Sequence, residues 1–249
     1  MKRRKFVTAA AASSLVSPLA FGATRSQMED DHEIYDLSTY ELTFASNRQA
    51  LLDYLNQTKA PFVKKKGARS FMMFMEVGDP EPTRLWTLTT YPDLVSYHHV
   101  IASPAQAQLQ AQSEAYAKAG QTYNRISSSL CYAFEGLKQM KDPIANAQLF
   151  ELRIYEGVNE DAVHRKIKMF NQEELDLFYR VDLNPIFFGR MVVGPYIPSL
   201  VYMLNFRDMD HREAAWKDFL AHPEWDNMKV KPEYARTVSN IRRIFLKPL

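Results

Sequence analysis

The sequence predicts an α+β protein in which two tandem ferredoxin-like units form a pseudo-dimeric α+β barrel. Three observations predict this fold. The chain has 249 residues with 46% hydrophobic content, which is enough to bury a sizeable core. Its first half is repeated in its second half. Each half reads strand, helix, strand, strand, helix, strand, which is the ferredoxin-like plan. One open four-stranded sheet leaves a face that needs cover, and a second unit supplies that cover.

Residues 1–22 read as an export segment that precedes the folded units. Arg3 and Arg4, followed by Phe6 and a weakly apolar Ala/Ser-rich run, resemble the twin-arginine export motif. An ordinary signal peptide with two chance arginines is the alternative. We place the cleavage site near Gly22 and expect an exported, periplasmic or extracytoplasmic protein. Twin-arginine passengers cross the membrane folded and often carry a cofactor, but the sequence leaves any cofactor unknown.

Charge and cysteine content narrow the function classes. Four of the 31 basic residues lie in positions 2–5, so 27 basic residues face 29 acidic residues after the export segment. No basic stretch interleaved with aromatics remains, so we expect no nucleic-acid partner. The short apolar run, kinked at Pro18, predicts no membrane span in the mature protein. Cys131 is the only cysteine, which excludes an intrachain disulfide, and we expect it to pack within a strand.

The first unit is expected over residues 34–137. Its strands are recognised by apolar and aromatic runs bounded by turn residues, and its first helix begins near Ser46, a plausible cap. We predict strands at 34–44, 71–77, 84–91 and 126–134, with helices at 46–66 and 92–119.

The second unit is expected over residues 148–249. Leu200, Tyr202, Leu204 and Phe206 recur at every second position, which is the period of a strand. Asp208 then offers a carboxylate cap to the following helix. We predict strands at 148–155, 185–193, 200–206 and 240–246, and a long helix at 160–179.

The repeat also gives a residue-by-residue alignment of the halves. The segment Tyr40–Phe44 aligns with Phe150–Ile154, and Leu85–Leu88 aligns with Leu200–Met203. In this alignment Thr43 takes the position of Arg153. The first half therefore lacks that arginine, so a site containing it would belong to the second half.

Four pieces of the second half, taken together, resemble the NIPSNAP family. Its domain opens with a Glu-Leu-Arg-x-Tyr strand, continues through a glycine-containing second strand, and carries Arg-Glu and then Pro-x-Trp on its later helices. The matching segments here are Phe150–Tyr155, the strand ending at Phe206, Arg212-Glu213 and His222–Trp225. Where many members carry His and Trp in the third strand, this chain has Tyr202 and Leu204. The resemblance implies a dimeric α+β barrel relative, and it leaves both a homodimer and the chemistry open.

The opening strand of the second unit supplies the first candidate site. Glu151, Arg153 and Tyr155 share one face, because alternate residues of a strand point the same way. If that face lines a cavity, the guanidinium and the phenol could hold a carboxylate or enolate ligand. Alternatively, Glu151 and Arg153 pair on the sheet surface or across to a neighbouring strand.

The later helices supply the other candidates. Arg212 and Trp216 are helical neighbours, for which stacking or a structural ion pair is expected rather than catalysis. His222 could act as a general base or bind haem iron, or it could cap the helix that contains Trp225. The histidines at 164 and 211 are expected to be exposed, and we predict no metal site. The full set of candidate ligand-binding residues is Arg153, Tyr155, Tyr202, Arg212, Trp216, His222 and Trp225.

Three functions fit these features. The first is a small-molecule binding protein with its ligand between sheet and helices. The second is an enzyme of the barrel-type monooxygenase or isomerase kind, which rests on fold analogy alone. The third is an interaction module without a ligand. The sequence lacks phosphate-loop, Gly-x-Ser-x-Gly and His-Glu-x-x-His motifs, so it does not establish an enzyme. We favour ligand binding.

Overall fold

The computed structural model describes residues 31–78, 80–105 and 118–249. Residues 31–249 form one compact unit. The export segment, its cleavage site and part of the helix predicted at 92–119 lie outside the described residues.

The first half contains four strands and its helices in the predicted order. Its strands are β1 (Ile34–Leu42), β2 (Ser70–Glu76), β3 (Thr83–Tyr91) and β4 (Arg125–Ala133). One long helical segment comprises α1 (Arg48–Tyr54), a π-helical turn (Leu55–Lys59) and α2 (Ala60–Lys65), and α3 (Leu94–Ile101) follows β3. Asn47, rather than the predicted Ser46, caps α1, because its side chain accepts from the Ala50 amide at 3.0 Å.

The second half repeats this order. Its strands are β5 (Leu149–Gly157), β6 (Asn184–Val193), β7 (Ser199–Phe206) and β8 (Val238–Pro248). Its helices are α6 (Glu160–Met169), a π-helical turn (Phe170–Glu174), α7 (Leu175–Arg180), α8 (Met209–Leu220), α9 (Pro223–Lys229) and a 3-10 turn (Pro232–Tyr234). Asp208 caps α8 as predicted, accepting from the His211 amide at 2.8 Å.

The strands close into a barrel in the order β1-β3-β2-β8-β5-β7-β6-β4, with every neighbouring pair antiparallel. Within each half the order is that of a ferredoxin-like sheet. The halves join where β2 pairs with β8 and β4 pairs with β6. The predicted α+β barrel of two ferredoxin-like units is therefore confirmed, and edge pairing between the two sheets is what closes it.

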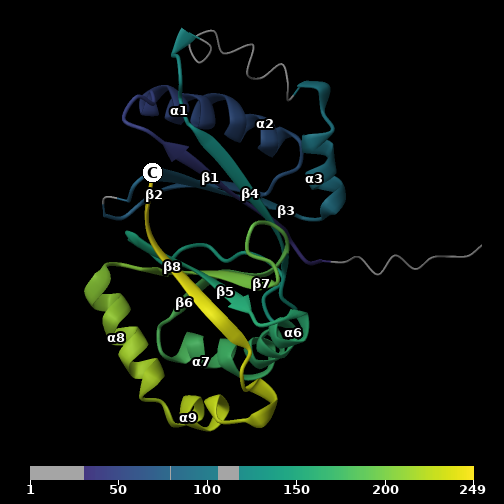
Figure 1. Ribbon diagram of the computed structural model, residues 1–249, viewed down its shortest axis with the longest axis vertical. Helices are drawn as coiled ribbons and strands as arrows, with labels where there is room; N and C mark the ends of the chain where they lie inside the picture. Colours follow the sequence, from purple (N-terminus) through teal and green to yellow (C-terminus); the bar gives the residue numbers. More distant parts are fainter. Residues whose placement is uncertain (1–30, 79, 106–117) are drawn as a thin grey trace, which may run out of the picture. The chain divides into compact units, whose positions relative to one another are not determined.

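Helices cover the outside of the barrel, with α1–α3 over the first-half strands and α6–α9 over the second-half strands (Figure 1). Apolar side chains fill the interior between the halves, among them Leu37, Trp86, Leu152 and Met203. A second, largely aromatic cluster lies between the second-half strands and their helices. Cys131 is buried in β4, as the sequence predicted.

The strand registers correct the alignment of the two halves. Arg153 pairs with Tyr202 in the second half, and Ser38 pairs with Thr87 in the first. Since Thr87 and Tyr202 occupy matching positions of their strands, the counterpart of Arg153 is Ser38 and not Thr43. Each match along β1 shifts by five residues, so Asp36 becomes the counterpart of Glu151.

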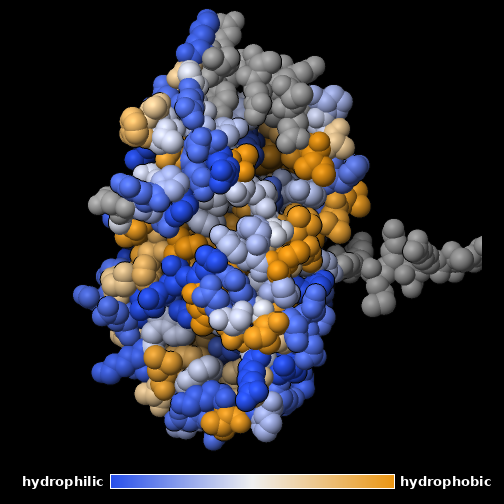
Figure 2. Space-filling model, viewed as in Figure 1, coloured by the Kyte–Doolittle hydropathy of each residue, from blue (hydrophilic) through white to orange (hydrophobic). Residues whose placement is uncertain are grey.

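The surface drawn in Figure 2 carries apolar residues in separate patches among hydrophilic ones. None of the described helices has both the length and the apolar content needed to cross a membrane.

Candidate functional site

Strand β5 presents its charged residues to the layer beneath the second-half helices. Its alternation sends Phe150, Leu152 and Ile154 into the barrel interior. Glu151 and Arg153 therefore point the other way, where their side chains meet residues of α8. The candidate residues of this strand thus lie between sheet and helices.

Glu151 is the centre of a buried hydrogen-bond network. Its fully buried carboxylate accepts from Arg153 Nη1 at 2.7 Å, from Arg212 Nε at 2.8 Å and Nη2 at 3.1 Å, and from Trp216 Nε1 at 2.9 Å. Burial alone would raise the pKa of this carboxyl, but the Arg212 hydrogen bond and the charge of Arg153 outweigh burial and lower the pKa below its ordinary value. The Glu151 carboxylate thus occupies the position next to Arg153 where the sequence analysis placed a carboxylate ligand. The structural ion pair predicted for Arg212 is confirmed.

The other side of the Arg153 guanidinium faces two phenols. Arg153 Nη2 donates to the Tyr155 hydroxyl at 3.1 Å, and that hydroxyl lies 2.9 Å from the Tyr202 hydroxyl. Burial raises the pKa of Tyr202 well above its ordinary value, so Tyr202 is a neutral phenol at neutral pH. Arg153 Nε is buried and has no hydrogen-bond partner among the described residues. The Trp216 ring covers the guanidinium, with its centre 4.5 Å away.

A buried lysine–glutamate pair lies in the same layer, and the sequence analysis missed it. Lys166 Nζ donates to Glu174 Oε2 at 2.7 Å and sits 4.5 Å from the ring centre of Phe170. Burial raises the Glu174 pKa even though the Lys166 charge lowers it. The sequence did contain a signal for this pair, because Lys166 falls at helical spacing with the apolar residues Val163 and Phe170.

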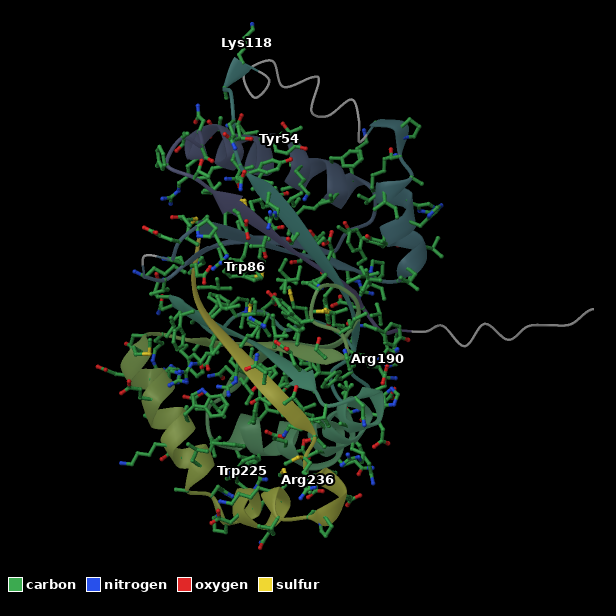
Figure 3. All side chains as sticks on the ribbon, in the orientation of Figure 1. Tyr54, Trp86, Lys118, Arg190, Trp225 and Arg236 are labelled. Carbon is green, nitrogen blue, oxygen red and sulfur yellow. The ribbon has the colours of Figure 1, made fainter. Side chains whose placement is uncertain are left out.

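The remaining candidates have packing and capping contacts. His222 caps α9, with its Nδ1 accepting from the Glu224 amide at 3.2 Å, which is the capping alternative that the sequence indicated. Trp225, which Figure 3 labels, lies on α9. It packs against Phe219, with ring centres 4.7 Å apart. The structure places neither residue in contact with Arg153.

His211 is buried, so the prediction that it is exposed was wrong. Its Nδ1 accepts from the Arg207 amide at 3.1 Å, and its Nε2 lies 2.7 Å from Asp182 Oδ2. The ring therefore joins the turn before α8 to the turn before β6. His164 is exposed, as predicted.

A cavity of about 440 Å³ opens between α6 and the β6–β7 hairpin. Val163 and His164 line it from α6, and Met191 and Ser199 line it from the strands. Val163 packs in the same apolar cluster as Tyr155 and Tyr202. This cavity therefore borders the cluster that contains Tyr155 and Tyr202, although neither these tyrosines nor Arg153 line it.

The described residues contain no group of three His, Cys, Asp or Glu side chains placed to hold a metal ion. The polar groups of the layer are instead the Glu151 carboxylate with two guanidinium groups, two phenols and an ammonium–carboxylate pair. Such groups bind and orient oxygen-containing ligands.

A sequence comparison identifies a family match in the half of the chain that contains this network. Residues 150–249 match the NIPSNAP family. This NIPSNAP match covers β5–β8 and the whole Arg153 network, whereas the first half lies outside it. No curated protein matches the chain.

Three solved structures share the fold across both halves. A proposed monooxygenase from Fusobacterium nucleatum is 12% identical, covering 88% of this chain and 93% of its own, with a TM-score of 0.57. A proposed monooxygenase from Lactobacillus acidophilus is 9% identical over 87% and 94% of the two chains, with a TM-score of 0.53. An anthrone oxidase-like protein is 7% identical over 89% and 93%, with a TM-score of 0.50. At these identities the three structures show the fold alone.

Proposed function

We propose that this chain is an exported NIPSNAP-like barrel protein that binds a small molecule between the second-half sheet and its helices. The observation that carries the proposal is the set of buried polar groups in an aromatic layer: Arg153 with an unpartnered Nε, the Tyr155–Tyr202 hydroxyl pair and the Lys166–Glu174 pair. Burying such groups is unfavourable unless they are paired or used.

The first half serves as an internal control for this argument. At matching strand positions it has Ser38 for Arg153 and Thr87 for Tyr202. Counted from the π-helical turn of each half, Leu51 takes the position of Lys166. The first half does keep Tyr40 at the position of Tyr155, where it accepts from Lys59 Nζ at 2.8 Å. It is built without counterparts of Arg153, Tyr202 and Lys166, which supports a binding role for those three residues in the second half.

The chemistry of the layer favours a planar ligand with an oxygen acceptor. Phe170, Phe178 and Phe188 surround Tyr202 with ring centres 4.7–6.1 Å away. Arg153 Nε and the phenol hydroxyls supply donors. The cavity lined by Val163 and Ser199 borders this layer.

Native mass spectrometry of the protein exported by its own signal tests this proposal. We expect a bound mass in the wild type that disappears in the Tyr155→Phe/Tyr202→Phe double variant. Tyr179→Phe is the matched control, because Tyr179 is half-exposed on α7. A bound mass that persists in the double variant would place the ligand elsewhere, and no bound mass in the wild type would favour the interaction module without a ligand.

The second candidate is an enzyme of the barrel-type monooxygenase or isomerase kind. It is favoured by the neutral Tyr202 phenol next to the Tyr155 hydroxyl and the Arg153 guanidinium, since these donors could stabilise a developing enolate oxygen. Oxygen uptake with anthrone as substrate tests this candidate. Oxygen uptake that is lost in Tyr202→Phe but kept in Tyr179→Phe would support the enzyme. No oxygen uptake by the wild type would leave ligand binding as the proposed function.

Export by the twin-arginine route is the remaining part of the proposal, and it rests on Arg3, Arg4 and Phe6. Changing both arginines to lysine is expected to leave the precursor in the cytoplasm. Undiminished export of that variant would indicate an ordinary signal peptide. The sequence also leaves open whether the protein forms a homodimer, and light scattering of the mature protein measures its oligomeric state.

A further inference from the structure

A second cavity, of about 460 Å³, opens into the barrel interior and not into the sheet–helix layer. Its lining comes from both halves, because β1, β3 and β4 face β5, β8 and the β6–β7 hairpin across it. Leu37, Trp86, Ile154 and Ile244 provide its apolar surface and belong to the interior cluster of the barrel. Figure 3 shows Trp86 between the strands of the two halves.

Positive charge exceeds negative charge at this cavity. Four arginines and two glutamates line it: Arg84, Arg125, Arg242, Arg243, Glu41 and Glu76. Glu76 is already engaged by Arg84 Nη1 at 3.5 Å and by Trp86 Nε1 at 3.4 Å. Arg242 donates from its Nε to Glu156, which is not part of the cavity lining, so this pair does not use the two Nη groups of Arg242. Neither Arg125 nor Arg243 forms an ion pair with any described residue.

The β6–β7 hairpin forms part of the cavity wall through Pro195 and Tyr196, and it contacts both β8 and β4. The Arg242 guanidinium stacks on the Tyr196 ring at 4.2 Å, which holds the β6–β7 hairpin against β8. Across the mouth, a Cβ on Gly194 would lie 2.7 Å from Ser129 Oγ, so the hairpin backbone packs directly on β4. Thr39, Ser127 and Ser129 add hydroxyl groups between the apolar surface and the arginines.

We infer that the barrel mouth binds an amphipathic anion, with a carboxylate or similar group held by Arg125 and Arg242 and an apolar body resting on Trp86. A guanidinium binds such oxyanions through two parallel hydrogen bonds, and an indole face supplies apolar area for a planar group. The cavity has the size of typical small-molecule sites, which run to roughly 300–1,000 Å³. This site is separate from the layer that contains Arg153.

Calorimetric titration of the full-length chain tests the inference with two probes that share a ring system. The probes are 1-naphthoate, which carries the charge, and 1-naphthalenemethanol, which does not. We expect naphthoate to bind at least about tenfold more tightly than the alcohol, as a charge-assisted contact requires. The Arg125→Ala/Arg242→Ala variant should reduce naphthoate affinity to that of the alcohol. Trp86→Phe should weaken both probes by a similar factor.

Two controls separate this site from the rest of the protein. Arg207→Ala removes an exposed arginine in the turn before α8 and should leave naphthoate affinity unchanged. Arg153→Ala distinguishes the two sites, because loss of naphthoate binding in that variant would assign naphthoate to the sheet–helix layer. Equal affinities for the two probes, undiminished binding by the Arg125→Ala/Arg242→Ala variant, or no binding at millimolar naphthoate would each overturn the inference. Thermal denaturation of each variant verifies that it is folded.

Discussion

Glu151→Gln is the substitution expected to cost most stability for the smallest change in shape. The wild-type carboxylate accepts four hydrogen bonds from Arg153, Arg212 and Trp216. An amide keeps one acceptor oxygen but turns an NH₂ group toward groups that are themselves donors. It also leaves two guanidinium ions, whose side chains are 12% and 13% exposed, without their counter-charge.

The magnitude follows from the burial of that network. Removing one partner of a buried ion pair costs about 3–5 kcal/mol, because the remaining charge is left uncompensated. For a chain of this size, each 1 kcal/mol lowers the melting temperature by roughly 2–4 °C, so a fall of about 6–20 °C is expected. Urea unfolding followed by tryptophan fluorescence measures the free energy of unfolding directly.

Glu213→Gln on α8 is the matched control, because Glu213 is exposed and follows Arg212 in the chain. It should change the free energy of unfolding by no more than about 0.5 kcal/mol. If Glu151→Gln costs less than about 1 kcal/mol, the network does not hold α8 on β5 and the reasoning fails.

The same variant has a defined pH dependence. The folded-state pKa of Glu151 is lowered. Its contribution to the free energy of unfolding is therefore fully present above the unfolded-state pKa of about 4.3, and it is lost as the pH falls through the folded-state pKa. The stability difference between wild type and Glu151→Gln should therefore shrink as the unfolding assay is moved from pH 7 to pH 3. A difference that stays constant with pH would contradict the lowered pKa.

Three further predictions follow from the second half. Lys166→Met should lower the free energy of unfolding by about 3–5 kcal/mol, because it leaves Glu174 buried and unpaired. Lys166→Met/Glu174→Met should be nearly neutral in urea unfolding, and a double variant as unstable as the single one would contradict this. His222→Ala should cost roughly 1 kcal/mol through the lost α9 cap, and His164→Ala, which removes an exposed ring, should cost less; equal effects would argue against the cap. The fragment 148–249 should be soluble only as a dimer, because β6 and β8 lose their partners β4 and β2; a stable monomer in light scattering would refute this.

The sequence predicted the strands well because their signal is local. Alternation and turn residues placed the start of all eight within two residues of the observed positions, for example 200–206 for β7 (Ser199–Phe206) and 240–246 for β8 (Val238–Pro248). Pairings between distant residues carry no such signal. Glu151 and Arg212 lie 61 positions apart, and only the packing of α8 on β5 brings them together.

The error in aligning the two halves has a physical cause with consequences for function. The triplets around Glu41 and Glu151 look alike, but matching them shifts β1 by five residues relative to the observed register. Five is odd, and an odd shift moves a residue to the opposite face of a strand. Glu41 therefore lines the cavity inside the barrel, while Asp36, the true counterpart of Glu151, accepts from Ser38 and Ser128 outside it.

That register also explains how one fold can hold the two proposed sites. Each strand offers one face to the barrel interior, which both halves share, and one face to a helix layer that belongs to its own half. A substitution such as Arg153 for Ser38 changes one layer without touching the shared interior. Conversely, Arg84, Arg125 and Arg242 meet at the barrel mouth only because the two halves close on each other. The helix layers are therefore free to diverge between halves, whereas a ligand at the mouth requires both halves to be present.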